Sequence, residues 1–173
     1  MQGYGPRVFS RRKRGGAEPA EIYLDLRSRA LRLDPAEAGI EPSDSHARVF
    51  GVVMDTGHPE GWWTLLALAD GTTSLYLSSG GGTIGGGEHE QVAGASLRLV
   101  RMAEAAFDQM TVSDEEDLPQ RGEVIIHALG FAGSRAARAP EDDLGHGRNE
   151  FSPVFHAAHD VITQLRLLDE GRR

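Results

Sequence analysis

The chain contains no cysteine, which removes several kinds of site at once. Disulfide bridges, thiolate nucleophiles, zinc ribbons and iron–sulfur clusters all depend on cysteine sulfur. No stretch approaches the roughly 18 apolar residues that a membrane-spanning helix needs, and the N-terminus lacks the apolar segment of a signal peptide. These absences lead us to expect a cytoplasmic protein without a membrane span.

Lysine is almost absent as well, because Lys13 is the only lysine among 18 basic residues. Such a bias towards arginine, together with abundant alanine and glycine, is typical of a bacterium with GC-rich DNA. The net charge of −8 conceals a basic beginning, since residues 1–14 carry five basic residues and no acidic one. The remainder, with 13 basic and 26 acidic residues, has a charge of −13 and repels phosphate groups. We therefore expect no nucleic-acid binding except through the 1–14 arm.

The length of 173 residues fits one domain with its own apolar core. Residues 1–17 show no apolar period and are predicted to form a mobile basic arm, which leaves residues 18–173 as a single domain. Apolar residues recur at helical spacing over 18–33 and predict a helix.

Alternating and apolar patterns predict the elements of this domain. Three β-like runs cover residues 48–55, 62–69 and 72–78, and Asp70-Gly71 predicts a type I′ hairpin between the last two. A long helix is predicted over 88–110, two further strands over 123–131 and 135–139, and a closing helix that begins at Ser152 and Pro153. The order α-βββ-α-ββ-α predicts an α+β fold, in which a single five-stranded antiparallel sheet packs with about three helices.

A glycine-rich loop is the most conspicuous local feature, since six of the eight residues from 80 to 87 are glycine. Gly80, Gly82 and Gly85 match the G-x-G-x-x-G pattern between a strand and a helix. However, the preceding strand closes an antiparallel hairpin, and Glu88 and Glu90 place carboxylates where a phosphate would bind. We therefore favour a tight corner. The alternative is a small-ligand or nucleotide site with these residues: Gly80, Gly82, Thr83, Gly85, Gly86, Glu88 and His89.

The histidines suggest one possible metal site. His89 begins an H-E-x-x-H pattern, but Ala93 stands where the second ligand is needed. His156 and His159 lie three residues apart on the closing helix, a spacing that can place two imidazoles on one face. The alternative for this pair is an ordinary solvated helix face. His127 lies in an apolar strand and is interpreted as a packed histidine rather than a catalytic base.

Two adjacent tryptophans provide a candidate interface. In a strand, Trp62 and Trp63 point to opposite faces, so one of them points outward. Exposed aromatic side chains often anchor protein contacts. The alternative is that helices cover both faces of the sheet at this point.

The run "ALADGTTSLYLSSGGGTIGGGEH" and the run "FSPVFHAAHDVITQLR" resemble a group of uncharacterised bacterial proteins in which a hairpin, a glycine loop and a helix recur in this order. The resemblance covers most of residues 18–169 and implies no particular activity. At the level of architecture, the chain is also similar to roadblock/longin and profilin-like folds. That similarity implies a dimerising or scaffolding module, and we transfer no functional residue from it.

No G-x-S-x-G elbow or other nucleophile motif is present, and we expect neither an enzyme nor a bound cofactor. Our preferred interpretation is a non-enzymatic protein-interaction or scaffolding module that associates with itself as a homodimer or with another protein. The alternative is a protein that binds a small ligand or a nucleotide, with catalysis open, at the loop of residues 80–87.

Overall fold

The computed structural model describes residues 17–171. Its strands are β1 (Val49–His58), β2 (Gly61–Leu68), β3 (Thr73–Leu77), β4 (Gly82–Ile84), β5 (Thr111–Val112), β6 (Glu123–Gly130) and β7 (Arg135–Pro140). Its α-helices are α1 (Glu21–Leu31), α2 (Glu90–Ala106), α3 (Glu141–Gly145) and α4 (Ser152–Gly171), with short 3₁₀ helices η1 (Gly86–Glu88) and η2 (Phe107–Gln109). The predicted arm lies almost entirely outside the described residues.

The strands form one antiparallel sheet in the order β4-β3-β2-β1-β6-β7-β5. The α+β class and the antiparallel sheet are as predicted, but the prediction of five strands is wrong, because the described residues form seven. The two additional strands are very short. β4 lies inside the glycine loop and β5 in the connector after α2, so tertiary pairing rather than local propensity places them.

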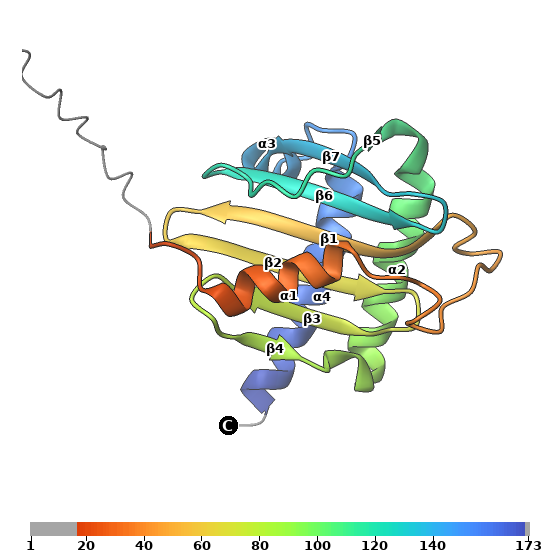
Figure 1. Cartoon of the computed structure of the whole chain (residues 1–173), viewed down its shortest axis with the longest axis horizontal. Coiled ribbons are helices and arrows are strands. Elements are labelled where there is room, and N and C mark those ends of the chain that lie inside the picture. Colours follow the sequence, from red (N-terminus) through yellow and green to blue (C-terminus); the bar gives the residue numbers. More distant parts are fainter. Residues whose placement is uncertain (1–16, 172–173) are drawn as a thin grey trace, which may run out of the picture.

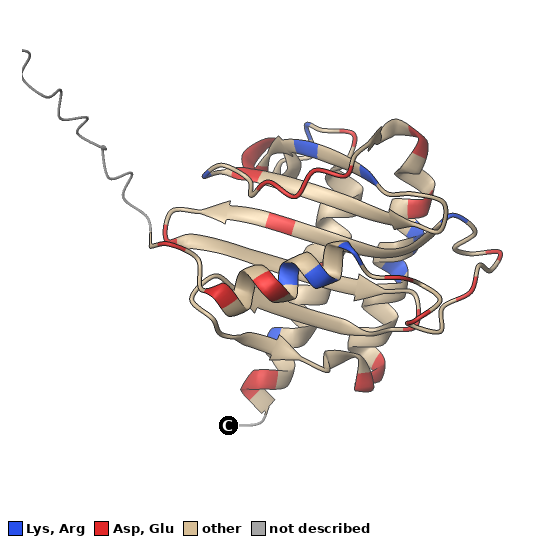
Figure 2. Ribbon diagram, viewed as in Figure 1, with Lys and Arg blue, Asp and Glu red and all other residues tan. Residues whose placement is uncertain are grey.

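Helices cover both faces of the sheet (Figure 1). On one face, α2 and α4 pack against each other and against the strands, and their buried side chains join those of the strands in the apolar core. On the opposite face lies α1, together with the connector of residues 113–121. Figure 2 shows acidic residues gathered along this connector in front of β6. No helix among the described residues is long and apolar enough to cross a membrane.

The turn between β2 and β3 differs from its prediction. A type I′ turn requires positive φ at both central residues, but only Gly71, with φ of 90°, has one. Asp70 instead uses its side chain, which accepts a hydrogen bond of 2.9 Å from the backbone N–H of Thr72. The strands are therefore joined by a longer loop that the Asp70 side chain closes.

Candidate functional site

A buried polar cluster lies at the centre of the sheet, on the face that α1 covers. Asp55 of β1 and Thr64 of β2 are direct cross-strand partners, and both are completely buried. The Thr64 hydroxyl donates to Asp55 Oδ1 at 2.6 Å, and Tyr23 Oη lies 2.8 Å from Thr64 Oγ1. An aspartate in an apolar strand needs such partners, because an unpaired buried charge is very unfavourable.

Arg27 of α1 provides the charge that balances this aspartate. Its Nη2 donates to Asp55 Oδ2 at 2.8 Å, and its Nε donates to both carboxylate oxygens at 3.1 Å. The remaining donors of the guanidinium bind the connector, where Nη1 donates to the carbonyl of Glu116 at 2.6 Å and Nη2 to that of Asp117 at 3.2 Å. One arginine therefore ties α1, β1 and the connector together.

His127 of β6 completes the cluster, with Nε2 3.2 Å from Asp55 Oδ2. Burial by itself would raise the pKa of Asp55, but hydrogen bonds from His127 and Arg27 outweigh burial and hold this pKa below its usual value. Burial raises the pKa of Tyr23 to about 12, although the bond with Thr64 opposes the change. At neutral pH the cluster thus contains an ionised Asp55 and a neutral Tyr23.

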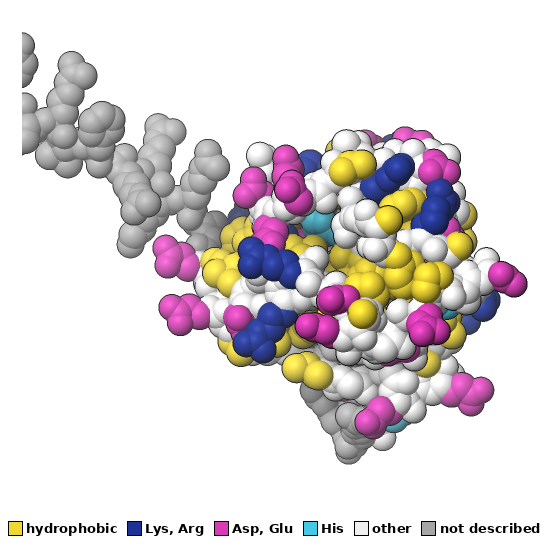
Figure 3. All heavy atoms as spheres, turned by 45° about the vertical axis from the view of Figure 1, so that its right-hand side comes forward, with side chains coloured by type: hydrophobic (Ala, Val, Ile, Leu, Met, Phe, Trp, Pro, Cys, Tyr) yellow, Lys and Arg dark blue, Asp and Glu magenta, His cyan; other side chains and the backbone are white. Residues whose placement is uncertain are grey.

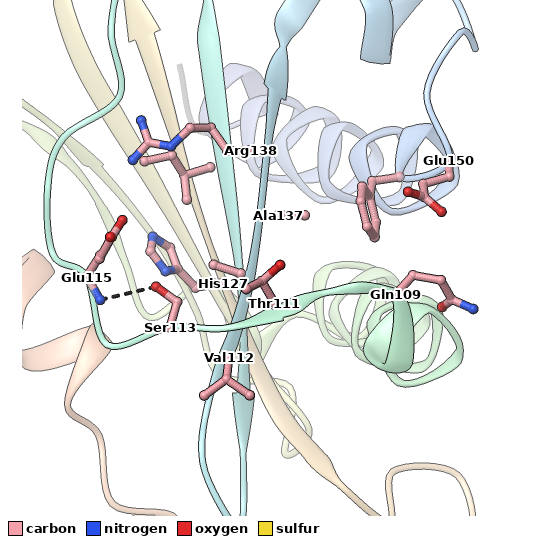
Figure 4. A pocket seen from close by; sticks show the side chains of 12 residues that line it. Gln109, Thr111, Val112, Ser113, Glu115, His127, Ala137, Arg138 and Glu150 are labelled. Atoms are coloured by element: carbon pink, nitrogen blue, oxygen red, sulfur yellow. Dashed lines mark hydrogen bonds between the residues drawn. The ribbon is translucent and has the colours of Figure 1, made fainter.

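Two cavities adjoin His127 at the surface, of about 450 and 410 Å³. Both are lined by His127 and by Ser113 and Glu115 of the connector. Figure 4 shows His127, Ser113 and Glu115 on one side of β7 in the larger cavity, with Gln109 and Glu150 on the other side. The sequence does not predict this constellation, because its pattern identifies His127 alone, as a packed residue.

The predicted ligand residues lie in a loop, and the fold constrains the four glycines among them. A Cβ at Gly82 would collide with the carbonyl oxygen of Leu75, and one at Gly86 with a methyl group of Leu165. Gly80 and Gly85 have φ of 97° and 78°, which favour glycine. The remaining predicted residues Thr83, Glu88 and His89 follow the chain through β4 and η1 into the start of α2. None of these seven residues lines the two cavities beside His127.

The predicted metal pair is divided between two environments. His156 is exposed, whereas the ring of His159 packs against Phe155 and Trp63, at centroid distances of 4.3 and 5.8 Å. The His159 Nε2 atom is enclosed without a hydrogen-bond partner. Across residues 17–171, no group of three or more histidine, aspartate or glutamate side chains is arranged to hold a metal ion.

Both tryptophans are half-buried and make contacts within the chain. Trp62 Nε1 donates to the carbonyl of Pro119 at 2.8 Å, which fastens the connector to the sheet. Trp63 points to the opposite face, towards His159 of α4. The contacts described for both tryptophans lie within the chain, and the predicted interface at these two residues stays a prediction.

Exposed apolar side chains gather instead around β4, the end strand of the sheet. Seven large apolar side chains among the described residues are exposed, and three of them lie on or beside this strand: Ile22, Leu77 and Ile84. A Cβ added at Gly80 would lie 3.4 Å from Ile22 Cγ2, so α1 begins beside the loop. Thr83 Oγ1 donates to Asp169 Oδ2 at 3.3 Å, which brings the end of α4 to the same place. We call the side chains of Ile22, Leu77 and Ile84 the β4-edge surface.

No protein-family model, no curated protein and no solved structure matches this chain. The function is therefore inferred from the residues and their geometry.

Proposed function

We propose that this protein is a non-enzymatic interaction module that associates with a second copy of itself through the β4-edge surface. The observation that carries the proposal is the clustering of exposed apolar side chains at one end of the sheet. Single exposed apolar residues are normal on protein surfaces, but a group of them favours a contact site. Ile84 is the most exposed of the three, at 71%.

The position of β4 in the sheet supports a second copy as the partner. Because β4 is the last strand of the order, one side of its backbone has no neighbouring strand among residues 17–171. Unpaired N–H and C=O groups of an end strand can pair with another strand. Two β4 strands related by a two-fold axis would be antiparallel, which continues the antiparallel pattern of the sheet. Apolar side chains on both faces of the edge would then be covered together.

The proposal is tested by the mass of the protein in solution. We expect light scattering after size-exclusion chromatography, at tens of micromolar, to give the mass of two chains. Ile84→Arg should give the mass of one chain, since it places a charge in the centre of the contact. The matched control is Val112→Arg, because Val112 is also β-branched, is 77% exposed, and lies on β5 at the opposite end of the sheet.

A wild-type protein with the mass of a single chain would contradict self-association. If Ile84→Arg and Val112→Arg keep the mass of two chains, the contact lies elsewhere and the β4-edge surface is not the interface. Equal dissociation by both variants would also count against this surface, because Val112 is remote from it.

A further inference from the structure

We propose that the outer edge of β7 binds an extended peptide of a partner protein, and that this peptide carries an arginine side chain. The sheet ends at β5, but β5 pairs with only two residues of β7, Arg135 and Ala136. The rest of β7, as far as Pro140, has β6 on one side and no strand of residues 17–171 on the other. This edge lies at the opposite end of the sheet from the β4-edge surface and does not depend on the proposed self-association.

The backbone of Arg138 faces the open position. In an antiparallel pair, alternate residues direct both N–H and C=O to the same neighbour. Ser134 faces β5, because its carbonyl accepts a hydrogen bond of 3.3 Å from the N–H of Ser113. Arg138, four residues further along, faces the same side, and β5 does not reach it. Glu141 agrees with this alternation, since its N–H donates to the carbonyl of Gly122, on the β6 side, at 2.8 Å. The N–H and C=O of Arg138 can therefore pair with an added strand.

The larger of the two cavities beside His127 lies where such a strand would run. It measures about 450 Å³ and is lined by three successive residues of β7, Ala136 to Arg138. Its walls come from both faces of the sheet, with Glu115 of the connector on one face and Glu150, just before α4, on the other. Figure 4 shows β7 running between these two side chains. A space that is open along a strand edge and walled over each face suits an extended chain.

The wall on the α4 face selects a basic side chain. Glu150 is exposed and has no ion pair within residues 17–171, and the ring of Phe151 lines the cavity beside it. An arginine can lay its alkyl stem along an aromatic ring while its guanidinium binds a carboxylate. The one arginine of the lining, Arg138, is already paired with Glu123 at 2.7 Å. Charge complementarity therefore favours a basic peptide over an acidic one.

The other wall defines the residues between the arginines. Side chains of an added strand alternate between the two faces of the sheet. Arg138 is opposite Ile125, and Ile125 is opposite Asp55, so the side chain of Arg138 points to the face of the connector. A second positive charge directly beside it is unfavourable, and a small polar residue can contact Ser113 there. The peptide thus alternates arginine with small polar residues. On the face in Figure 3, carboxylates surround exposed apolar side chains, which is the combination that an arginine side chain uses.

Three blocked pentapeptides test the proposal: Thr-Arg-Thr-Arg-Thr, the same peptide with glutamate in place of arginine, and the first peptide with every backbone nitrogen methylated. We expect calorimetric titration of the full chain at low salt to detect saturable binding of the first peptide only, with a dissociation constant below about 1 mM. The methylated peptide keeps both charges but cannot donate backbone hydrogen bonds, so it separates strand pairing from attraction by charge.

Two variants test the role of Glu150. Glu150→Gln should weaken binding of the arginine peptide by about tenfold, because a charge-assisted hydrogen bond is lost. The matched control is Glu88→Gln, since Glu88 is also an exposed carboxylate two residues before a long helix, and it lies in the glycine loop at the other end of the sheet. It should bind the peptide as the wild type does.

Hydrogen exchange measured by NMR locates the peptide on the protein. The amide of Arg138 should exchange quickly in the protein alone and at least about tenfold more slowly at saturating peptide. The amide of Ala137 is the internal control, because it faces β6 and should exchange slowly in both states.

Four results would overturn the proposal: equal binding of the methylated peptide, equal binding of the glutamate peptide, a loss of binding in Glu88→Gln but not in Glu150→Gln, or unchanged exchange at Arg138. Slow exchange at Arg138 without peptide would also overturn it. If that slow exchange depends on protein concentration, a second copy occupies the edge; if it does not, the chain itself does. Ile84→Arg lies at the other end of the sheet and should bind the peptide normally, so a failure of the dimer proposal leaves these expectations intact.

Discussion

Asp55 is held in an apolar sheet by donors from three different elements, and their removal has different consequences. Arg27 is 4% exposed and, among the described residues, supplies the only positive charge that touches this carboxylate apart from a protonated His127. Breaking a buried ion pair from one side leaves an uncompensated charge, which is more costly than the pair itself is favourable.

We therefore expect Arg27→Met to lower the free energy of unfolding by about 3–5 kcal/mol in urea denaturation. The control is Arg29→Met, two residues further along α1. Arg29 forms an exposed ion pair with Asp25 at 3.0 Å, and exposed pairs contribute about 0–1 kcal/mol. A similar small loss for both variants would show that Asp55 is accommodated without Arg27.

His159 gives stability a dependence on pH. Burial lowers the pKa of His159 from the ordinary value of 6.5, nearby His156 lowers it further, and Asp160 opposes the change. Below pH 6.5 the unfolded chain therefore binds a proton that the folded protein does not yet accept. Stability should be fully present above pH 6.5 and should fall as the pH decreases towards the folded pKa.

The variant that tests this effect is His159→Leu, which cannot titrate. Its free energy of unfolding, measured from pH 7.5 to 5, should fall less steeply than that of the wild type. His156→Gln is the control, because His156 is exposed on the same helix. Parallel curves for wild type and His159→Leu would assign the acid sensitivity to other groups.

At the scale of elements, β4 depends on glycines that differ sharply in what surrounds them. Gly82 has a φ of 150°, which residues other than glycine rarely adopt, and a Cβ at this position would collide with the carbonyl oxygen of Leu75. Both features disfavour a side chain here. Gly81 has no positive φ, and a Cβ there would lie 4.0 Å from Leu77 Cδ1, an ordinary contact. The two neighbouring glycines therefore differ in whether they tolerate replacement by alanine.

We expect Gly82→Ala to lower the free energy of unfolding by more than about 1 kcal/mol, because the backbone must move away from β3. Gly81→Ala should be neutral or stabilise by up to about 1 kcal/mol, since alanine restricts the unfolded chain. Thermal unfolding of the two variants compares them directly. Equal effects would mean that the loop is held less tightly than its contacts indicate.

Element prediction from the sequence succeeded where the apolar pattern is long. The helices over 18–33 and 88–110 correspond to α1 and α2 with η2, and the closing helix does begin at Ser152. The pattern could not reveal β4 or β5, because three and two residues are too few for a period. Asp70-Gly71 is compatible with two local structures, a type I′ turn and a loop closed by the Asp70 side chain, and the apolar pattern did not distinguish them.

At the scale of the whole molecule, the polar cluster could not be predicted from spacing. Asp55 and Arg27 are 28 residues apart, and His127 follows Asp55 by 72. One signal was nonetheless available. Asp55 ends the apolar run from Val49 to Met54, and a charged residue in such a strand requires a partner of opposite charge. The sheet order, with β1 between β2 and β6, brings Thr64 and His127 to Asp55, and the packing of α1 on the sheet brings Arg27.

The order of the strands also has a consequence for the newly made chain. β1 pairs with β2 on one side and with β6 on the other. However, β1 ends at His58 and β6 begins at Glu123, which is 65 residues later. At about 5–20 residues per second, a ribosome needs roughly 3–13 s to add these residues. During that interval the first three strands expose the unpaired edge of β1. In the cell, a chaperone or fast synthesis would shield this edge. The strand that they protect, β1, is almost completely buried in the finished protein.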